Sequence, residues 1–243
     1  ERLEQEYGAR VIATAPTVPY KVCLRTGEEI DIDTPEKWPD PHEAKLLLEP
    51  MVRASIIVMK DLQSAIMRLC SDRRGHSLEI MHLDDQRILM KYTLPLGEIV
   101  VDFYDRLKEL SSGYASVEYE DAGYEQADLV KVSILINKEE VEPLSLICHR
   151  STAYENGRLL VTKLKNAMDR QLFEIIIQAA VGSKILARER LAPLRKDVTA
   201  KCYGGDITRK RKLLEKQKEG KKRMKRIGNV DLSQEVFFTV LRK

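Results

Sequence analysis

Apolar residues between positions 50 and 119 recur first at every second position and then at helical spacing, and this succession of periods constrains the fold more than any other feature. The patterns predict strand, helix, strand, strand, helix and strand at 50–59, 62–70, 78–83, 87–93, 99–107 and 114–119. The second helix is expected to carry a stripe of Ile99, Val100, Phe103, Tyr104 and Leu107. This order is the ferredoxin-like βαββαβ arrangement, an antiparallel sheet with both helices on one face. We predict one such domain over residues 48–125.

The segments on either side of this domain have less regular apolar patterns. Strands are predicted at 18–24 and 28–33, and the prolines between 34 and 41 predict a linker, so residues 1–38 are interpreted as the remnant of a preceding α+β domain with its linker. After the domain, the patterns predict a hairpin at 130–148, a helix at 154–168 and a buried central strand at 173–178, whereas 183–191 fits a strand or a helix. The predicted fold class is α+β, with a C-terminal domain over 128–243.

The charges of the chain are strongly segregated. Residues 195–228 contain fourteen Lys and Arg against four acidic residues, a net charge of +10, whereas the rest contains 27 basic and 34 acidic residues, a net charge of −7. Only that stretch can approach a polyanion without repulsion. Asp206 can cap a long basic helix from 207 to about 226, which is polar all round and gains little from packing. Nucleic acid is the first candidate partner and a membrane surface the second.

The segment 201–229 therefore contains the main candidate binding residues. Tyr203 offers a stacking surface, the pair at 204–205 lets backbone amides approach a phosphate, and the basic helix would follow a nucleic-acid backbone. A solvated helix is the alternative interpretation. A second basic point, Arg73-Arg74 before Gly75, is either an RNA contact or the C-terminal cap of a helix.

The sequence gives no basis for a catalytic or metal site. The four cysteines are scattered, with no CxxC pair, and the four histidines fall in different predicted elements. The run Asn137-Lys138-Glu139-Glu140 is similar to the guanine-selecting element of GTPases, but it lacks the final Asp and the chain has no phosphate loop, so we interpret it as a hairpin turn. No apolar run reaches the roughly 20 residues of a membrane-spanning helix. Because residue 1 is Glu within a charged stretch, the chain is expected to continue a longer protein.

Four motifs resemble the LepA family, also called elongation factor 4. They are TAPTVPYKV at 14–22, SSGYASVEYEDAGY at 111–124, RQLFEIIIQAAVGSKILAR at 170–188 and KCYGGDITRK at 201–210. Residues 48–125 also resemble the fifth domain of elongation factor G, and 1–38 would then be the end of its third domain. The residues of the first two motifs are more similar to those of mitochondrial members of the family than to those of typical bacterial members.

The resemblance implies the C-terminal half of a ribosome-dependent GTPase that remodels tRNA positions on elongating ribosomes, with GTP and Mg held by N-terminal GTPase domains outside this chain. Large-subunit rRNA and tRNA would be its partners, the protein would be a monomer, and no cofactor would bind to this part. The expected RNA-binding residues are Lys201, Tyr203, Arg209, Lys210, Arg211, Lys212, Lys221, Lys222, Arg223, Lys225 and Arg226, together with Arg73 and Arg74.

The alternative function is a stand-alone RNA-binding module for ribosome assembly, without GTPase activity. A peripheral membrane protein held by the basic segment is a further alternative. The expected location is the mitochondrial matrix, including a peripheral position at the inner membrane, or else the bacterial cytoplasm.

Overall fold

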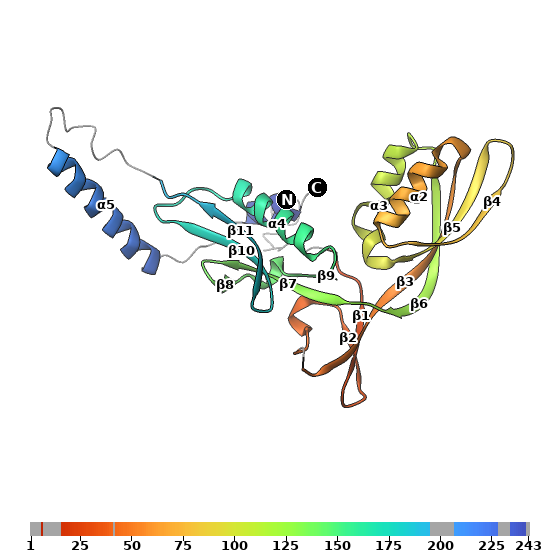
Figure 1. Ribbon diagram of the computed structural model, residues 1–243, viewed down its shortest axis with the longest axis horizontal. Coiled ribbons are helices and arrows are strands. Elements are labelled where there is room, and N and C mark those ends of the chain that lie inside the picture. The colour runs from red at the N-terminus through yellow and green to blue at the C-terminus, as the bar shows by residue number, and fades with distance from the viewer. Residues whose placement is uncertain (1–5, 7–15, 41, 195–206, 228–233, 242–243) are drawn as a thin grey trace. The chain divides into compact units, whose positions relative to one another are not determined.

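The computed structural model describes residues 6, 16–40, 42–194, 207–227 and 234–241 (Figure 1). Two compact units contain them. The first comprises residues 16–129 with 147–149, and the described parts of 130–146 and 150–243 belong to the second. Each unit has its own antiparallel sheet, so the α+β class is confirmed.

The first unit contains the predicted ferredoxin-like arrangement. Its strands β3 (Ala44–Met59), β4 (His76–His82), β5 (Arg87–Pro95) and β6 (Ser116–Gln126) lie in the antiparallel order β4-β5-β3-β6. The helices α2 (Gln63–Asp72) and α3 (Leu96–Leu110) cover one face of this sheet (Figure 1). The last strand begins at Ser116 and not at Tyr114, because residues 111–113 form a turn after α3.

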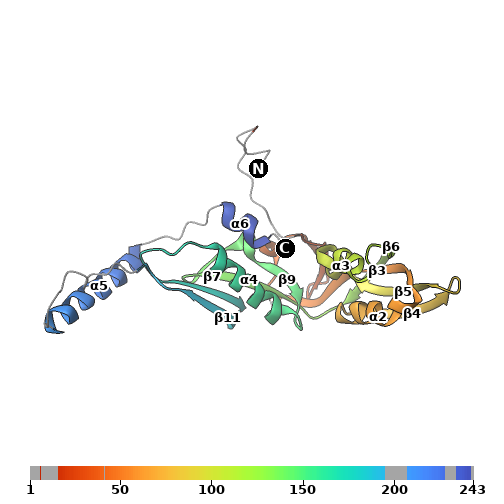
Figure 2. The ribbon, with the colours of Figure 1, turned by 90° about the horizontal axis from the view of Figure 1, so that it is seen from above.

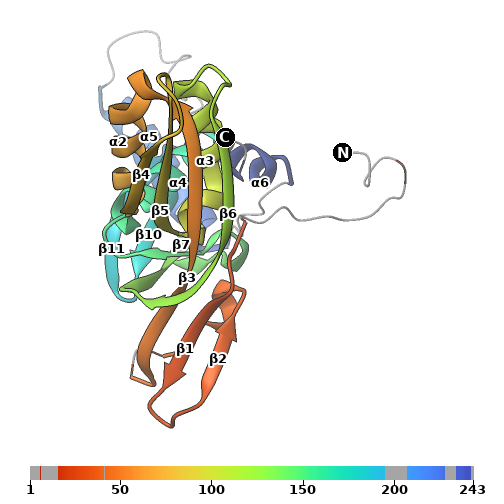
Figure 3. The same cartoon turned by 90° about the vertical axis from the view of Figure 1, so that its right-hand side faces the viewer.

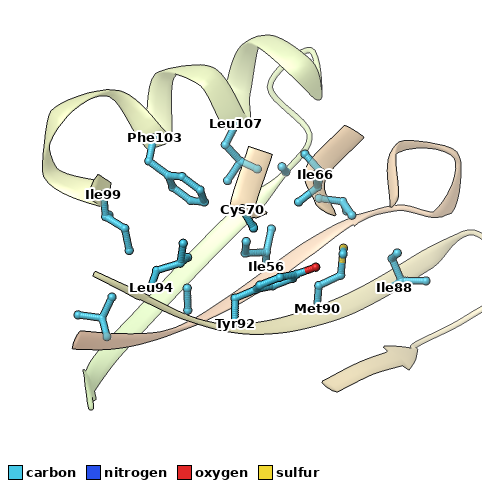
Figure 4. Close-up of a cluster of buried hydrophobic side chains, with 14 residues drawn as sticks. Ile56, Ile66, Cys70, Ile88, Met90, Tyr92, Leu94, Ile99, Phe103 and Leu107 are labelled. Carbon is cyan, nitrogen blue, oxygen red and sulfur yellow. The ribbon is translucent and has the colours of Figure 1, made fainter. Parts of the chain in front are cut away.

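The core of this unit lies between the sheet and its two helices (Figure 4). Alternate residues of β3 point into it, and Phe103 and Leu107 of α3 are fully buried there. Val100 and Tyr104 had been expected in the same stripe, but they are 45% and 48% exposed. Each follows a buried residue by one position, which turns it about 100° away around the helix axis.

Two further strands extend the same sheet at its other end. Strand β1 (Tyr20–Leu24) pairs with β2 (Glu29–Ile32) and with the first residues of β3, so β3 is shared by both parts (Figure 3). The short 3-10 helix η1 (Pro35–Lys37) follows β2, and Trp38 packs against the small core of these strands. The predicted boundary between 38 and 48 thus falls inside one hydrogen-bonded sheet, although the division into domains itself stays a prediction.

The second sheet is built from β7 (Leu129–Ile136), β8 (Glu139–Glu140), β10 (Ile175–Val181) and β11 (Lys184–Leu191), in the order β11-β10-β7-β8. The 3-10 helix η3 (Glu142–Leu144) and strand β9 (Leu146–His149) follow β8 along the chain. Strand β10 is central, as predicted for 173–178. The ambiguous stretch 183–191 is a strand because its residues pair with β10 across the turn at Gly182, which has a φ of 56°.

Helix α4 (Ala153–Ala167) packs on β10 and β11 (Figure 2). A Cβ added at Gly157 would lie 3.0 Å from the Cβ of Ala179, so a glycine at this position lets the helix approach the sheet closely. A further helix, α6 (Gln234–Leu241), packs on α4 and buries Val236 and Val240. The sequence patterns had not predicted α6, because its run of apolar residues is only two turns long.

Candidate nucleic-acid interface

The predicted basic helix is α5 (Ile207–Ile227), one continuous helix of 21 residues. At 1.5 Å per residue it is about 30 Å long. It contains eleven Lys and Arg and two Glu, so it is polar on every side and carries a net charge of +9. A helix of this length and charge can follow the backbone of a nucleic acid over several phosphates.

The basic side chains of α5 that the structure describes have no carboxylate partner. These are Lys210, Arg211, Lys212, Lys216 and Lys218, which are exposed except for the half-exposed Lys210. Within that described part of the helix, Glu215 lies at the right spacing for Lys218, yet the two form no ion pair within 4 Å. These five charges are therefore available to an external anion.

Arg73 and Arg74 lie in a different electrostatic setting. The guanidinium of Arg74 donates two hydrogen bonds of 2.8 Å to the two carboxylate oxygens of Glu49, and its Nε lies 3.5 Å from Glu98. Arg73 forms ion pairs with Asp102 at 2.5 Å and with Glu98 at 3.5 Å. Both arginines link the end of α2 to α3, and Arg74 links it also to β3.

The end of α2 explains why these arginines occupy this place. Arg74 adopts a left-handed conformation with a φ of 59°, its N–H donates to the Ser71 carbonyl, and the N–H of Gly75 donates to the Cys70 carbonyl. This is a Schellman cap, in which the left-handed position usually holds glycine. The sequence placed a glycine at the helix exit, but Arg74 takes the left-handed position. Gly75 is needed for space, because a Cβ there would lie 2.6 Å from a methyl group of Leu94.

From this backbone conformation the side chain of Arg74 reaches Glu49 and Glu98. Glu49 is only 6% exposed, and a buried carboxylate needs a cation and hydrogen bonds to remain charged. Burial alone would lower the pKa of Arg74, but the hydrogen bonds and charges of Glu49 and Glu98 outweigh it and raise the pKa above its ordinary value. The predicted helix C-cap at this position is confirmed, but backbone N–H groups form it and the arginine side chains pair with carboxylates. RNA contact by Arg73 and Arg74 stays a prediction.

The other expected RNA-binding residues stay predictions as well. Lys201 and Tyr203 lie outside the described residues, as does the capping Asp206. The backbone of α5 places the remaining basic positions on one helix, but the structure describes no side chain for the following: Arg209, Lys221, Lys222, Arg223, Lys225 and Arg226.

The run at 137–140 is a hairpin turn, as predicted. Asn137 and Lys138 have φ values of 52° and 79°, which is the pattern of a tight turn between antiparallel strands. The side-chain oxygen of Asn137 accepts a hydrogen bond of 3.0 Å from the N–H of Ile176, so this side chain is used to join two strands. The run also has Glu in place of the final Asp of the guanine-selecting element, and no phosphate loop occurs in the sequence.

Other kinds of site have little support in the described residues. Within them, no group of three or more His, Cys, Asp or Glu side chains is arranged to hold a metal ion. Cys23 and Cys70 are free thiols. Among the helices of the same residues, none combines the length and the apolar character needed to cross a membrane.

Comparison with known proteins covers both units. The family described as "Elongation factor G C-terminus" matches residues 46–135, and the family described as "GTP-binding protein LepA C-terminus" matches residues 136–242. The chain belongs to the LepA, or elongation factor 4, family. Together the two matches cover residues 46–242 of this chain.

Individual LepA relatives are similar over the entire chain. "Elongation factor 4" of Symbiobacterium thermophilum is 55% identical over 99% of this chain and 40% of its own length. "Translation factor GUF1 homolog, mitochondrial" of Arabidopsis thaliana is 54% identical over 100% of this chain and 37% of its own length. The chain therefore spans about 40% of the length of the curated relatives it matches. A solved structure from Thermus thermophilus overlaps 34% of this chain and 12% of its own at 22% identity, with a TM-score of 0.32 that is too low to support an argument.

Proposed function

We propose that this chain is the RNA-contacting part of a LepA-type translational GTPase, and that it attaches the factor to ribosomal RNA and tRNA without performing chemistry itself. The observation that supports this best is α5, whose five described basic side chains have no carboxylate partner, whereas Arg73 and Arg74 form ion pairs with Asp102 and Glu49. Unpaired cations on a long exposed helix release counterions when they neutralise phosphates, which is the main source of affinity for RNA.

The whole factor would act on elongating ribosomes and remodel tRNA positions, in the manner of a back-translocation. GTP and Mg would bind to N-terminal GTPase domains of the same protein. Bacterial relatives and relatives named mitochondrial are nearly equally similar to this chain, so the proposal applies to the mitochondrial matrix, including the surface of the inner membrane, and to the bacterial cytoplasm. The factor would work as a monomer.

Ribosome co-sedimentation across a salt series tests the proposal. The test variant changes Lys210, Arg211, Lys216 and Lys218 to Gln. The matched control neutralises four basic residues outside α5, so both variants lose the same total charge. The control positions are Arg53, Arg87, Arg106 and Lys165.

The logarithm of the binding constant should fall linearly with the logarithm of salt concentration, with a slope of about −0.7 per neutralised phosphate on single strands and −0.9 on duplexes. Neutralising four contacting residues should therefore make the slope shallower by about 3 to 4 units, and the control should keep the original slope. Equal slopes for the α5 variant and the unchanged chain would remove α5 from the interface. GTP turnover by chain and ribosomes above that of ribosomes alone would contradict the absence of chemistry.

A further inference from the structure

Tyr114 is the most exposed large hydrophobic residue in the described part of the chain. Its side chain is 84% exposed, whereas the next ones, Tyr119 and Leu159, are 58% exposed. It lies between the end of α3 and the start of β6. A single exposed hydrophobic residue is normal on a protein surface, so the exposure of Tyr114 points to a partner only together with the fixed backbone that displays it.

The turn before Tyr114 is held by a dense set of hydrogen bonds. The hydroxyl of Ser111 donates to the Leu107 carbonyl at 2.8 Å and accepts from the N–H of Ala115 at 3.0 Å. The N–H of Tyr114 itself donates to the Ser111 carbonyl at 3.0 Å. Ser111 and Ala115 are buried, so both ends of the turn are fixed to the body of the unit.

The same turn contains two consecutive residues in the left-handed region. Ser112 has a φ of 51° and Gly113 a φ of 86°. A serine in this region is strained, and such strain persists only where the surrounding structure imposes it. The turn therefore fixes the backbone from which the ring projects, which reduces the backbone entropy that is lost when a partner binds.

The charge of the unit limits which partner can bind. Residues 16–129 contain 13 basic and 22 acidic residues, a net charge of −9. Contact with RNA from this unit therefore cannot depend on general attraction to phosphates. Stacking of an aromatic ring on a base requires no charge and tolerates any base.

The surroundings of the ring favour a base over a protein surface. Ser112 and Gly113, which precede the ring in the chain, are small and uncharged, so they leave room for a nucleotide. Residues that dominate protein interfaces lie instead at the centre of a well-packed patch. RNA-binding proteins commonly read bases that are splayed out of a helix by stacking them on Tyr, Phe, Trp or His.

We infer that Tyr114 is a stacking platform for an unpaired base of ribosomal RNA. This inference rests on the proposed function, and it adds an uncharged contact in the first unit to the charged contact of α5. The two contacts differ in their response to salt, because counterion release depends on charge and stacking does not.

The test compares Tyr114→Ala, Tyr114→Phe and Tyr114→Leu in ribosome co-sedimentation across the same salt series. Tyr119→Ala is the control, since it removes the next most exposed tyrosine of the same unit. One stacked base contributes a factor of about 5 to 150 in affinity, so Tyr114→Ala should weaken binding within that range without changing the salt slope. Tyr114→Phe should bind within about twofold of the unchanged chain, because stacking does not require the hydroxyl group.

Three results would overturn the inference. These are full affinity of Tyr114→Ala, an equal loss for Tyr119→Ala, and full affinity of Tyr114→Leu, which would indicate an apolar protein pocket in place of a base. The failure of the proposed function looks different, because it appears as an unchanged salt slope in the α5 variant. Circular dichroism of each variant checks that the fold is intact, as expected for changes at a side chain that is 84% exposed.

Discussion

Replacing Arg74 by Met, Glu49 by Leu, and both together measures how strongly their ion pair supports the first unit. The two side chains are joined by two hydrogen bonds of 2.8 Å, and their side chains are 23% and 8% exposed. Methionine keeps a side chain with a Cβ in the left-handed position, so the cost of that conformation is present in every variant and cancels.

The magnitude follows from the burial of Glu49. Removing Arg74 leaves a carboxylate that is almost out of water without its cation, and breaking a buried pair in this way costs about 3–5 kcal/mol. Because Arg74 itself is partly exposed, we expect about 3 kcal/mol, at the lower end of that range. The double variant removes both charges together, so it should lie within about 1 kcal/mol of the unchanged chain.

Urea unfolding followed by fluorescence measures these differences. The chain has one tryptophan, Trp38, which packs in the first unit, so its fluorescence reports on that unit. With a urea dependence of about 1–3 kcal/mol per molar, a loss of 3 kcal/mol lowers the midpoint by roughly 1–3 M. If the free-energy changes of the two single variants simply add up in the double variant, the pair does not hold this region together and our electrostatic reasoning is wrong.

Three further predictions concern the same core. Gly75→Ala should destabilise the unit by about 1–3 kcal/mol in urea unfolding, because the new Cβ would meet Leu94 and lie 2.8 Å from the carbonyl oxygen of Cys70. Phe103→Ala should cost about 3–5 kcal/mol in the same assay, since the ring is fully buried. Burial raises the pKa of Cys70 from 9.0 to about 12, so iodoacetamide at pH 9 should label this thiol only when the unit unfolds, more slowly than the half-buried Cys23, as measured by peptide mass spectrometry. The unfolded thiol ionises above pH 9 while the folded one does not, so stability should decrease as the pH rises from 9 to 12.

The elements predicted best from the sequence are those in which buried apolar residues recur at a regular spacing. Alternation in β3 and the stripe of α3 are local patterns, and each identifies a strand or a helix without knowledge of its partner. The predicted stripe of α3 was wrong at Val100 and Tyr104, since these apolar residues lie beside buried positions and only packing shows that they face outward. The display of Tyr114 was missed for a similar reason, because an aromatic residue before an alternating run has the pattern of a strand.

Local sequence patterns could not predict ion pairs between residues that are far apart in the chain. Nothing near Arg74 in the sequence indicates that its partner is Glu49, 25 positions earlier, or that Lys165 pairs with Glu189, 24 positions later. In the acidic body of the chain, carboxylates outnumber cations, so a basic residue there readily finds a partner when the chain folds. In α5 there are eleven cations and two acids, and so most of its charges cannot be neutralised within the helix. The local excess of charge, more than the presence of basic residues, is therefore what makes a binding prediction possible, and it favours α5 over Arg73 and Arg74 as the first place to look for RNA.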